Sequence, residues 1–270
     1  MNRLCALYDV SRAGYYARIK RGVCRRTEQD RELTKTIRAI FDEHKGRYGY
    51  RRVQEELKRM GIAVGLRRVA RLMRAGGMRG RVARIYRSKA KVKQVHAQHP
   101  NLLWNERAMA PNQVWVADVT YIRAGARWSY LAIIMDQWSR RLLGWRLART
   151  RGTWLTRAVF DEAFAERRPE RLIFHSDRGA EYTSPGFGDH LHAMGVLQSA
   201  TRGGAPEDNP HAESFFHSLK GEAIHGVRFS TEASLRSAIQ DFVRYYNCQR
   251  LHSSLGYRPP IEVEAQAAHI

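Results

Sequence analysis

Three acidic residues in the second half of the 270-residue chain have the types and spacing for chemistry at phosphorus. Asp118 lies in a run rich in Val, Thr and Tyr, Asp177 ends a second apolar run, and Glu213 follows Asp177 with 35 residues between them. Carboxylate oxygens are hard ligands that suit Mg²⁺, and two such ions can activate an attacking oxygen and stabilise a leaving one. We therefore take the three acids as candidate catalytic residues and candidate ligands for Mg²⁺, with Mn²⁺ as a substitute.

The residues around Glu213 predict where its side chain lies. Asn209 suits the N-cap of a helix and Pro210 its first position, which puts Glu213 in the first turn or just beyond it. Lys220 follows seven residues later on the same helix face, with His217 between them, and we expect Lys220 to contact DNA phosphate. Any one of the acids alone is more often a surface or capping residue. Only their joint arrangement favours a catalytic site.

The surrounding elements must bring the acids together. Three strands joined by short turns predict an antiparallel meander, and helices alternate with two further strands after it. We expect strands at 114–122, 128–136, 142–148, 171–177 and 196–200, and helices at 156–167, 184–194, from 210 and at 231–247. This order predicts an α/β fold, a mixed sheet covered by helices, and matches a ribonuclease-H-like fold. In that fold the first and fourth strands are neighbours, so Asp118 and Asp177 would meet at one edge.

The charge of the chain is concentrated in its first part. The net charge is +21, of which residues 1–110 contribute +19 and residues 111–270 only +2. A compact region of such charge repels itself unless it meets a polyanion, and phosphate contacts supply most of the non-specific affinity for nucleic acid. A merely soluble basic surface is the plainer interpretation, but solubility needs a net charge of only ~2–8. We therefore expect double-stranded DNA as a partner.

Helical periodicity in this basic part predicts an all-α DNA-binding region. We expect helices at 28–44, 50–60 and 65–75, the last two joined by a glycine-containing turn that suits a helix-turn-helix. On the third helix three arginines share one face, as a recognition helix requires for contacts with phosphates or guanine edges. A solvated basic face is the alternative. The candidate DNA-binding residues are Arg67, Arg71 and Arg74, with Arg51 and Arg52 on the preceding helix.

Composition shifts divide the chain into five expected segments. Between Arg79 and Lys93 there are seven basic residues and no acid, which is typical of a solvated linker or one laid along a phosphate backbone. His96 and His99 have no cysteine pair nearby, which disfavours a zinc site. The segments are 1–27, basic and irregular; 28–77, helix-turn-helix; 78–110, basic linker; 111–225, catalytic core; and 226–270, C-terminal helix and tail.

Cysteine usage and hydropathy bear on the compartment. The three cysteines are scattered and form no CxxC pair, which indicates a reducing cytoplasm rather than a disulfide framework. The longest apolar run, Tyr130–Met135, is far shorter than the ~18 residues of a membrane span. The first nine residues hold no apolar signal-peptide core. We therefore expect a cytoplasmic protein without a membrane partner.

Five sequence blocks together resemble the transposases of the IS-three family of insertion sequences. The blocks are Tyr48–Arg52, Trp115–Tyr121, His175–Tyr182, Asp208–Lys220 and Tyr246–Tyr257. The resemblance covers nearly the whole chain. It implies a retroviral-integrase-like core in which Asp118, Asp177 and Glu213 form a DDE triad, with Mg²⁺-dependent cleavage at the element's ends and strand transfer into target DNA.

The resemblance also implies partners and a setting. It suggests a downstream-frame, OrfB-type product that works with an upstream-frame product or as a fusion with it. It further implies a homo-oligomer in the DNA complex and a bacterial cytoplasm, with nucleoid association through bound DNA. Two other functions stay open at this point. One is a non-catalytic DNA-binding regulator of transposition. The other is a nuclease for RNA–DNA hybrids, which the basic helix-turn-helix disfavours because a helix reads A-form grooves poorly.

Overall fold

The computed structural model describes residues 5, 7–20, 24–81, 100–103, 107–202 and 208–267. The chain divides into two compact units, Met1–Arg81 and Val82–Ile270, and each is described by itself. Within the described ranges, no helix has the length and apolar character needed to cross a bilayer. Most of the expected linker, with His96 and His99, lies outside the described residues.

The first unit begins with a helix that sequence reasoning missed. Residues Arg12–Lys20 form α2, so the prediction that residues 1–27 are irregular was wrong. The Ser11 hydroxyl accepts a hydrogen bond from the backbone N–H of Gly14 at 3.0 Å and so caps the first turn. This cap offsets the low helix propensity of Gly14.

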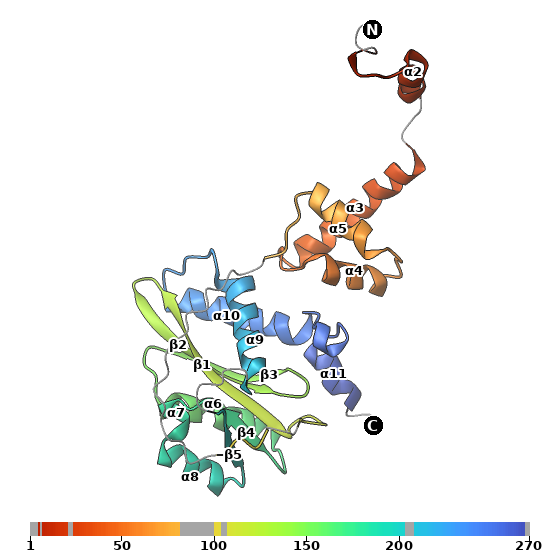
Figure 1. The fold of residues 1–270 in the computed structure, drawn as a ribbon. Coiled ribbons are helices and arrows are strands. Elements are labelled where there is room, and N and C mark those ends of the chain that lie inside the picture. Colours follow the sequence, from red (N-terminus) through yellow and green to blue (C-terminus); the bar gives the residue numbers. More distant parts are fainter. Residues whose placement is uncertain are drawn as a thin grey trace. The chain divides into compact units, whose positions relative to one another are not determined.

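Three further helices pack together in the first unit (Figure 1), which confirms the predicted set. They are α3 (Arg25–Glu43), α4 (Tyr50–Arg59) and α5 (Leu66–Ala75). Apolar residues at helical spacing form their common core, where Ile37, Val53 and Val69 are fully buried. Gly61 has φ +76° directly after α4, a conformation that favours glycine and turns the chain toward α5.

The second unit contains a five-stranded sheet in the order β3-β2-β1-β4-β5. The first three strands form the expected antiparallel meander, and β4 lies parallel to both β1 and β5. The strands are β1 (Val114–Ala124), β2 (Arg127–Asp136), β3 (Leu142–Ala148), β4 (Ile173–Ser176) and β5 (Leu197–Ala200). The prediction that the first and fourth strands are neighbours is confirmed.

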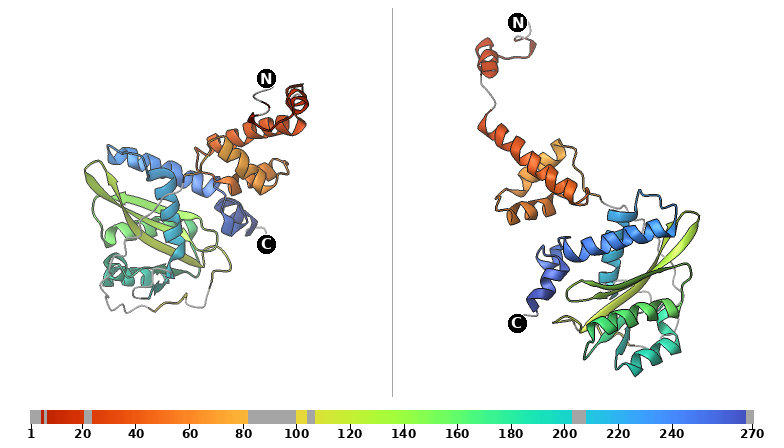
Figure 2. Two further views of the ribbon diagram at one scale, coloured as in Figure 1. Left: turned by 45° about the horizontal axis from the view of Figure 1, so that its top comes forward. Right: turned by 180° about the vertical axis from the view of Figure 1, so that it is seen from behind.

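Helices cover both faces of this sheet (Figures 1 and 2). One face packs on α6 (Thr153–Arg167), α7 (Ala180–Thr183) and α8 (Pro185–Ala193). The other face packs on α9 (Pro210–Leu219) and α10 (Glu232–Cys248), and a π-helical turn, η2 (Lys220–Ile224), continues α9. A 3₁₀ turn, η3 (Ser253–Leu255), and α11 (Pro260–Ala267) follow. The layers are those of the predicted α/β fold.

The ends of several elements differ from the predicted ones by one to three residues. Strand β4 has four residues and ends at Ser176, so Asp177 lies just beyond it. Helix α6 begins three residues before Thr156. Helix α10 begins at Glu232 because Thr231 and Ser234 form a reciprocal capping box.

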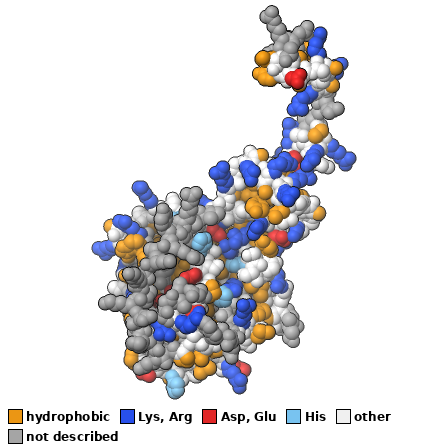
Figure 3. Space-filling model, viewed as in Figure 1, with side chains coloured by type: hydrophobic (Ala, Val, Ile, Leu, Met, Phe, Trp, Pro, Cys, Tyr) orange, Lys and Arg blue, Asp and Glu red, His pale blue; other side chains and the backbone are white. Residues whose placement is uncertain are grey.

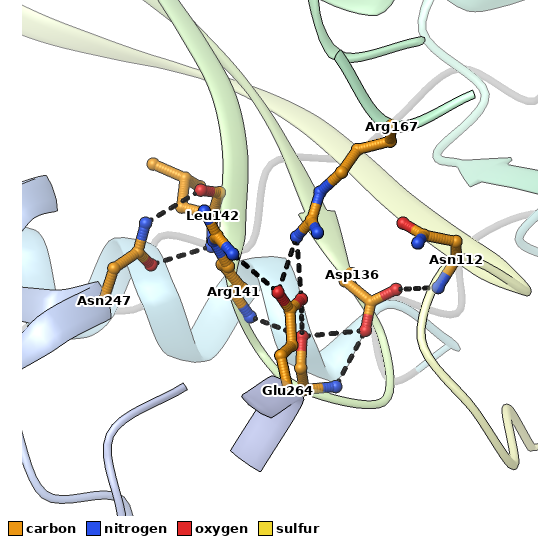
Figure 4. A network of polar contacts seen from close by, with 8 residues as sticks. Asn112, Asp136, Arg141, Leu142, Arg167, Asn247 and Glu264 are labelled. Carbon is orange, nitrogen blue, oxygen red and sulfur yellow. Dashed lines mark hydrogen bonds and ion pairs between the residues drawn. The ribbon is translucent and has the colours of Figure 1, made fainter. Parts of the chain in front are cut away.

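The C-terminal helices are fastened to the sheet by a network of polar contacts (Figure 4). Glu264 on α11 accepts hydrogen bonds from Ser139 Oγ at 2.8 Å, Arg141 Nη1 at 2.7 Å and Arg167 Nη2 at 2.8 Å. Asp136 accepts bonds from the N–H of Ser139 at 2.8 Å and from its hydroxyl at 2.9 Å. These five residues are called the C-terminal network below.

Candidate active site

Asp118 and Asp177 lie side by side at one edge of the sheet. The parallel pairing of β1 with β4 ends at Ala117 opposite Ser176, so each aspartate takes the next position along its chain. Asp118 Oδ1 accepts the N–H of Val119 at 2.7 Å, and Asp177 Oδ1 accepts the N–H of Gly179 at 2.9 Å. Short backbone contacts thus orient both carboxylates.

The electrostatics of this edge disfavour charge on Asp118. Its side chain is partly exposed, but protein atoms surround the carboxylate, and this burial together with repulsion by Asp177, Glu181 and Glu213 raises its pKa to about 8. Burial also raises the pKa of Asp177, although the N–H of Gly179 works in the opposite direction. The edge therefore holds acidic groups whose charges are not balanced by the fold.

A fourth acid, Glu181 on α7, belongs to this cluster. It is 5% exposed, its pKa is raised by burial, and its Oε2 atom lies 3.6 Å from Arg151 Nε. Glu181 lies within the block His175–Tyr182, but no role is predicted for it from the sequence, because the one-turn helix α7 is too short to show periodicity. The only sequence feature that relates Glu181 to the site is its spacing of four residues from Asp177.

Glu213 lies in the first turn of α9, as predicted, and its side chain is exposed. Its charge contributes to the raised pKa of Asp118. The Asn209 side chain does not cap this helix, contrary to expectation. Instead its Nδ2 atom donates to the carbonyl oxygen of Ala117, in the first half of β1, at 3.0 Å. Asn209 thereby fastens the start of α9 beside Asp118.

The segment before α9 is fastened to the parallel strands as well. His175 on β4 is buried and contacts Ser199 Oγ through Nδ1 at 2.9 Å and the carbonyl oxygen of Asp208 through Nε2 at 3.2 Å. Burial lowers the pKa of His175, which favours the neutral imidazole. Asp208 also accepts a hydrogen bond from the backbone N–H of Arg202 at 2.8 Å. These contacts help to set the position of Glu213 relative to β4.

Lys220 extends from the start of η2 to the same strand as Asp118. Its ammonium donates to Thr120 Oγ1 at 2.7 Å and lies 5.7 Å from the ring centroid of Tyr121. Burial lowers the pKa of Lys220, and the charge of Asp118 opposes that change. The Lys220 ammonium is therefore held near Asp118 by Thr120. Its contact with DNA phosphate stays a prediction.

The C-terminal block braces the helix that carries Glu213 and Lys220. Arg250 donates through Nη2 to Glu222 Oε1 at 2.7 Å and to Ser218 Oγ at 3.0 Å, and through Nε to Glu222 Oε2 at 2.9 Å. All three residues are buried. A bidentate buried pair of this kind holds a defined geometry, so residue 250 fixes the junction of α9 with η2.

The donor set at this edge fits a hard divalent cation. Asp118, Asp177 and Glu213 supply only carboxylate oxygens, and a cation would offset the burial and the repulsion that raise the pKa of Asp118. Within the described part of the chain, no three acidic, histidine or cysteine side chains are close enough together to hold an ion. The exposed Glu213 side chain has to approach the two aspartates for a shared site to form.

The predicted DNA-binding arginines lie on the surface of the first unit, where Figure 3 shows many lysine and arginine side chains. Arg67, Arg71 and Arg74 are all exposed on α5, which agrees with their predicted common face. Arg71 Nη2 forms an ion pair with Asp30 Oδ2 on α3 at 2.6 Å.

The two arginines on α4 differ from each other. Arg51 is exposed, whereas Arg52 is half-buried with its guanidinium 5.6 Å from the ring centroid of Tyr48. Tyr48 is fully buried in the helical core. The position of the Arg52 side chain is explained by its packing on Tyr48 without any contact to DNA.

Comparisons with known proteins agree with both units. Residues 28–86 match the family described as HTH-like domain, and residues 108–206 and 194–260 match two families described as Integrase core domain. The solved HTLV-2 integrase catalytic core domain in complex with magnesium (dimeric form) is 16% identical, with a TM-score of 0.43, over 58% of this chain and 99% of that chain.

Curated relatives match at higher identity and over most of their length. The transposase for insertion sequence element IS904 of Lactococcus lactis is 36% identical over 86% of this chain and 93% of the relative. Transposase InsF for insertion sequence IS3A of Escherichia coli (strain K12) is 32% identical over 97% of this chain and 92% of the relative. The chain therefore belongs to the IS-three (IS3) family of insertion-sequence transposases, polynucleotidyl transferases of the DDE type that bind DNA.

Proposed function

We propose that Asp118, Asp177 and Glu213 are the catalytic and metal-binding triad of this transposase. The observation that carries the proposal is the parallel pairing of β1 with β4, which ends at Ala117 opposite Ser176 and so places Asp118 and Asp177 side by side. Burial and the charges of Asp177, Glu181 and Glu213 raise the pKa of Asp118 to about 8, which agrees with this placement. Acids placed so that they repel one another at a sheet edge are what a cation site requires. When bound, Mg²⁺, or Mn²⁺ as a substitute, would activate the attacking oxygen and stabilise the leaving oxygen at phosphorus.

The chain's own residues set up this reaction in distinct ways. Asn209 holds the start of α9 against β1, and Arg250 holds its far end. Lys220, kept in place by Thr120, supplies positive charge for a DNA phosphate next to the triad. The substrates are the terminal ends of the insertion element and target DNA, cleaved and joined by attack of a hydroxyl on a phosphodiester.

The proposal also assigns a role to each segment of the chain and to its partners. Segment 28–77 binds the element's ends, 78–110 is the linker, 111–225 the catalytic core and 226–270 the C-terminal helix and tail, preceded by the basic segment 1–27. The active species is a homo-oligomer on DNA in the bacterial cytoplasm, associated with the nucleoid through that DNA. The chain is the downstream-frame product and acts with an upstream-frame product or as a fusion with it.

The decisive experiment is cleavage and joining of a duplex carrying the element's own end, with Mg²⁺ or with chelator. We expect Glu213→Gln to lower the rate by more than the ~10–100-fold typical for loss of a residue that only orients a metal ligand. DNA affinity should stay unchanged, since Glu213 lies outside the helix-turn-helix. Glu232→Gln, an acid on α10 paired with Arg149, is the matched control and should retain activity. Normal joining by the Glu213 variant would refute the triad.

The arginines of α5 are tested by the salt dependence of binding. Replacing Arg67, Arg71 and Arg74 together with Ala should weaken duplex binding and lower the slope of log affinity against log salt by up to ~2–3 units. Arg38, whose guanidinium bonds the carbonyl oxygen of Gly76, provides a control substitution in the same unit. An unchanged slope would remove the three arginines from the interface.

A further inference from the structure

The hairpin formed by β1 and β2 extends beyond Asp118 (Figures 1 and 2), and it carries two exposed aromatic rings. Tyr121 is 57% exposed and Trp128 is 51% exposed. They are diagonal neighbours on one face, because Tyr121 pairs with Tyr130 and Trp128 pairs with Arg123. On the opposite face the side chains are buried, namely Ile122, Ala124 and Ser129. The exposed face, here called the hairpin patch, consists of Tyr121, Arg123 and Trp128.

The rings of the hairpin patch are arranged so that they retain open surfaces. Their centroids are 5.2 Å apart and their planes meet at 85°, an edge-to-face contact. In such a contact the edge of one ring covers one face of the other, so three of the four faces are left uncovered by the pair itself. Flat, half-exposed aromatic faces of this kind can stack on nucleic acid bases.

The hairpin tip is fixed in position. The N–H of Gly125 donates to the carbonyl oxygen of Phe229 at 2.6 Å, and a Cβ at Gly125 would lie 3.0 Å from the carbonyl oxygen of Ser230. Gly125 has φ +60°, which favours glycine at this turn. The exposure of the rings is therefore a property of a hairpin anchored against the segment before α10.

The basic side chains around the hairpin patch favour nucleic acid as its binding partner. Between Val119 and Leu131 the sequence contains Arg123 and Arg127, both exposed, and no acidic residue. The ammonium of Lys220 lies 5.7 Å from the Tyr121 ring centroid, within the range of a cation–π contact. Aromatic rings among cations, without acids, complement bases flanked by phosphates better than they complement an apolar protein surface.

Tyr121 of the hairpin patch and Asp118 of the proposed triad lie on the same strand, β1. Tyr121 comes three residues after Asp118, so at a rise of ~3.3 Å per residue the two lie roughly 10 Å apart along the strand. One DNA strand advances about 3.4 Å per nucleotide in a duplex. Side chains alternate along a strand, so Tyr121 and Asp118 point to opposite faces of β1. The pairing of β1 with β4 ends at Ala117, and Lys220 beyond that point contacts both Thr120 on the Asp118 face and the ring of Tyr121. A DNA strand that passes around this edge of β1 can therefore reach the patch and the triad together.

We propose that the hairpin patch stacks on unpaired DNA bases close to the reacting phosphate and so selects ends whose terminal base pairs are open. This inference rests on the proposed triad for its location, but its evidence is independent: ring geometry, exposure and local charge. Duplex ends need bases to be unstacked before such contact, which costs a few kcal/mol for a paired base and least for one already single-stranded.

The experiment measures the affinity of the full chain for two DNAs. One is a duplex with a three-nucleotide unpaired tail that contains 2-aminopurine, and the other is the same duplex with a blunt end. We expect Trp128→Leu combined with Tyr121→Leu to weaken binding of the tailed DNA by about 5- to 150-fold and to abolish quenching of 2-aminopurine, since stacking contributes ~1–3 kcal/mol per base. Blunt duplex affinity should change less than twofold. Trp128→Phe retains a ring and should behave like the wild type.

Three outcomes would overturn the proposal. Equal losses on tailed and blunt DNA would show a general effect on folding or charge. Unchanged affinity for tailed DNA would show that the patch does not contact bases. A loss of affinity for tailed DNA in Trp128→Phe as large as that in the double leucine variant would exclude stacking. Glu213→Gln measured on the same tailed DNA separates the two proposals, because it should quench 2-aminopurine normally while failing to cleave.

Discussion

Two clusters of acidic side chains lie on the same sheet, and they differ in how their charges are balanced. In the C-terminal network, Glu264 faces Arg141 and Arg167, and although burial works to raise its pKa, the hydrogen bonds and charge of Arg167 hold that pKa below its usual value. Asp118 faces Asp177, and its pKa rises to about 8. Within the described part of the chain, Asp118 forms no ion pair with a basic side chain.

The difference separates acids whose charge the fold balances from acids whose charge it leaves unbalanced. A carboxylate that meets two guanidiniums contributes to stability in the free protein. A carboxylate that meets other carboxylates lowers stability unless a proton or cation is present. The comparison therefore predicts opposite consequences for neutralising one member of each cluster.

The largest effect is expected for Asp118→Asn. Because the folded protein holds a proton on Asp118 up to a higher pH than the unfolded chain does, the stability of the metal-free protein falls as pH rises from about 4 towards 8. The variant removes this ionisation, so at pH 8 it should unfold at an equal or higher urea concentration than the wild type. Strand transfer should fall by more than about 100-fold.

The stability of Asp118→Asn is measured by urea unfolding in the presence of chelator, and its activity by a strand-transfer assay in Mg²⁺. Stability lost together with activity would contradict the comparison, because it would place Asp118 among the acids whose charge the fold balances.

An intermediate effect is expected for Asn209→Ala. The variant loses the hydrogen bond to the carbonyl oxygen of Ala117 and frees the start of α9, so Glu213 is less well placed. We expect a ~10–100-fold lower rate, the range for residues that orient metal ligands. Titration of Mg²⁺ in the cleavage assay checks the cause, since a positioning defect should raise the Mg²⁺ concentration needed for half-maximal rate. A lower rate at unchanged Mg²⁺ dependence would argue against it.

The smallest effect on the reaction is expected for Glu264→Gln. Loss of the carboxylate leaves Arg141 and Arg167 without their charged acceptor and should lower the free energy of unfolding by about 1–3 kcal/mol at pH 7. The activity of the folded protein should be unchanged. Glu262→Gln, two residues earlier on the same helix, provides the control.

The pH dependence of this difference has a defined sign. The pKa of Glu264 is lower in the folded protein than in the unfolded chain, so its contribution is present above about pH 4.5 and is lost as the pH falls through the folded value. Wild type and Glu264→Gln should therefore converge in urea unfolding at acid pH. A difference that persists there would show that packing, rather than charge, accounts for the loss.

Sequence patterns predicted what depends on local periodicity. The strands and helices themselves and the first-turn position of Glu213 follow from alternation, turn residues and helix signals. The neighbouring positions of Asp118 and Asp177 follow only once the order of these elements is matched to a ribonuclease-H-like fold. The patterns missed what depends on contacts between distant segments. The Asn209 side chain bonds β1 rather than its own helix, and Glu181 reaches the site through a one-turn helix too short to show periodicity.

The buried contacts of Arg250 and Glu264 also bear on the order in which the unit is completed during synthesis. Arg250 bonds residues 28 and 32 positions earlier, and Glu264 bonds Ser139 across 125 positions. Chains fold as they emerge from the ribosome, and partners that emerge late are missing from early intermediates. A nascent chain would thus carry all three acids of the proposed triad before the brace at the end of α9 exists, so we expect no nicking of DNA until Arg250 has emerged from the ribosome.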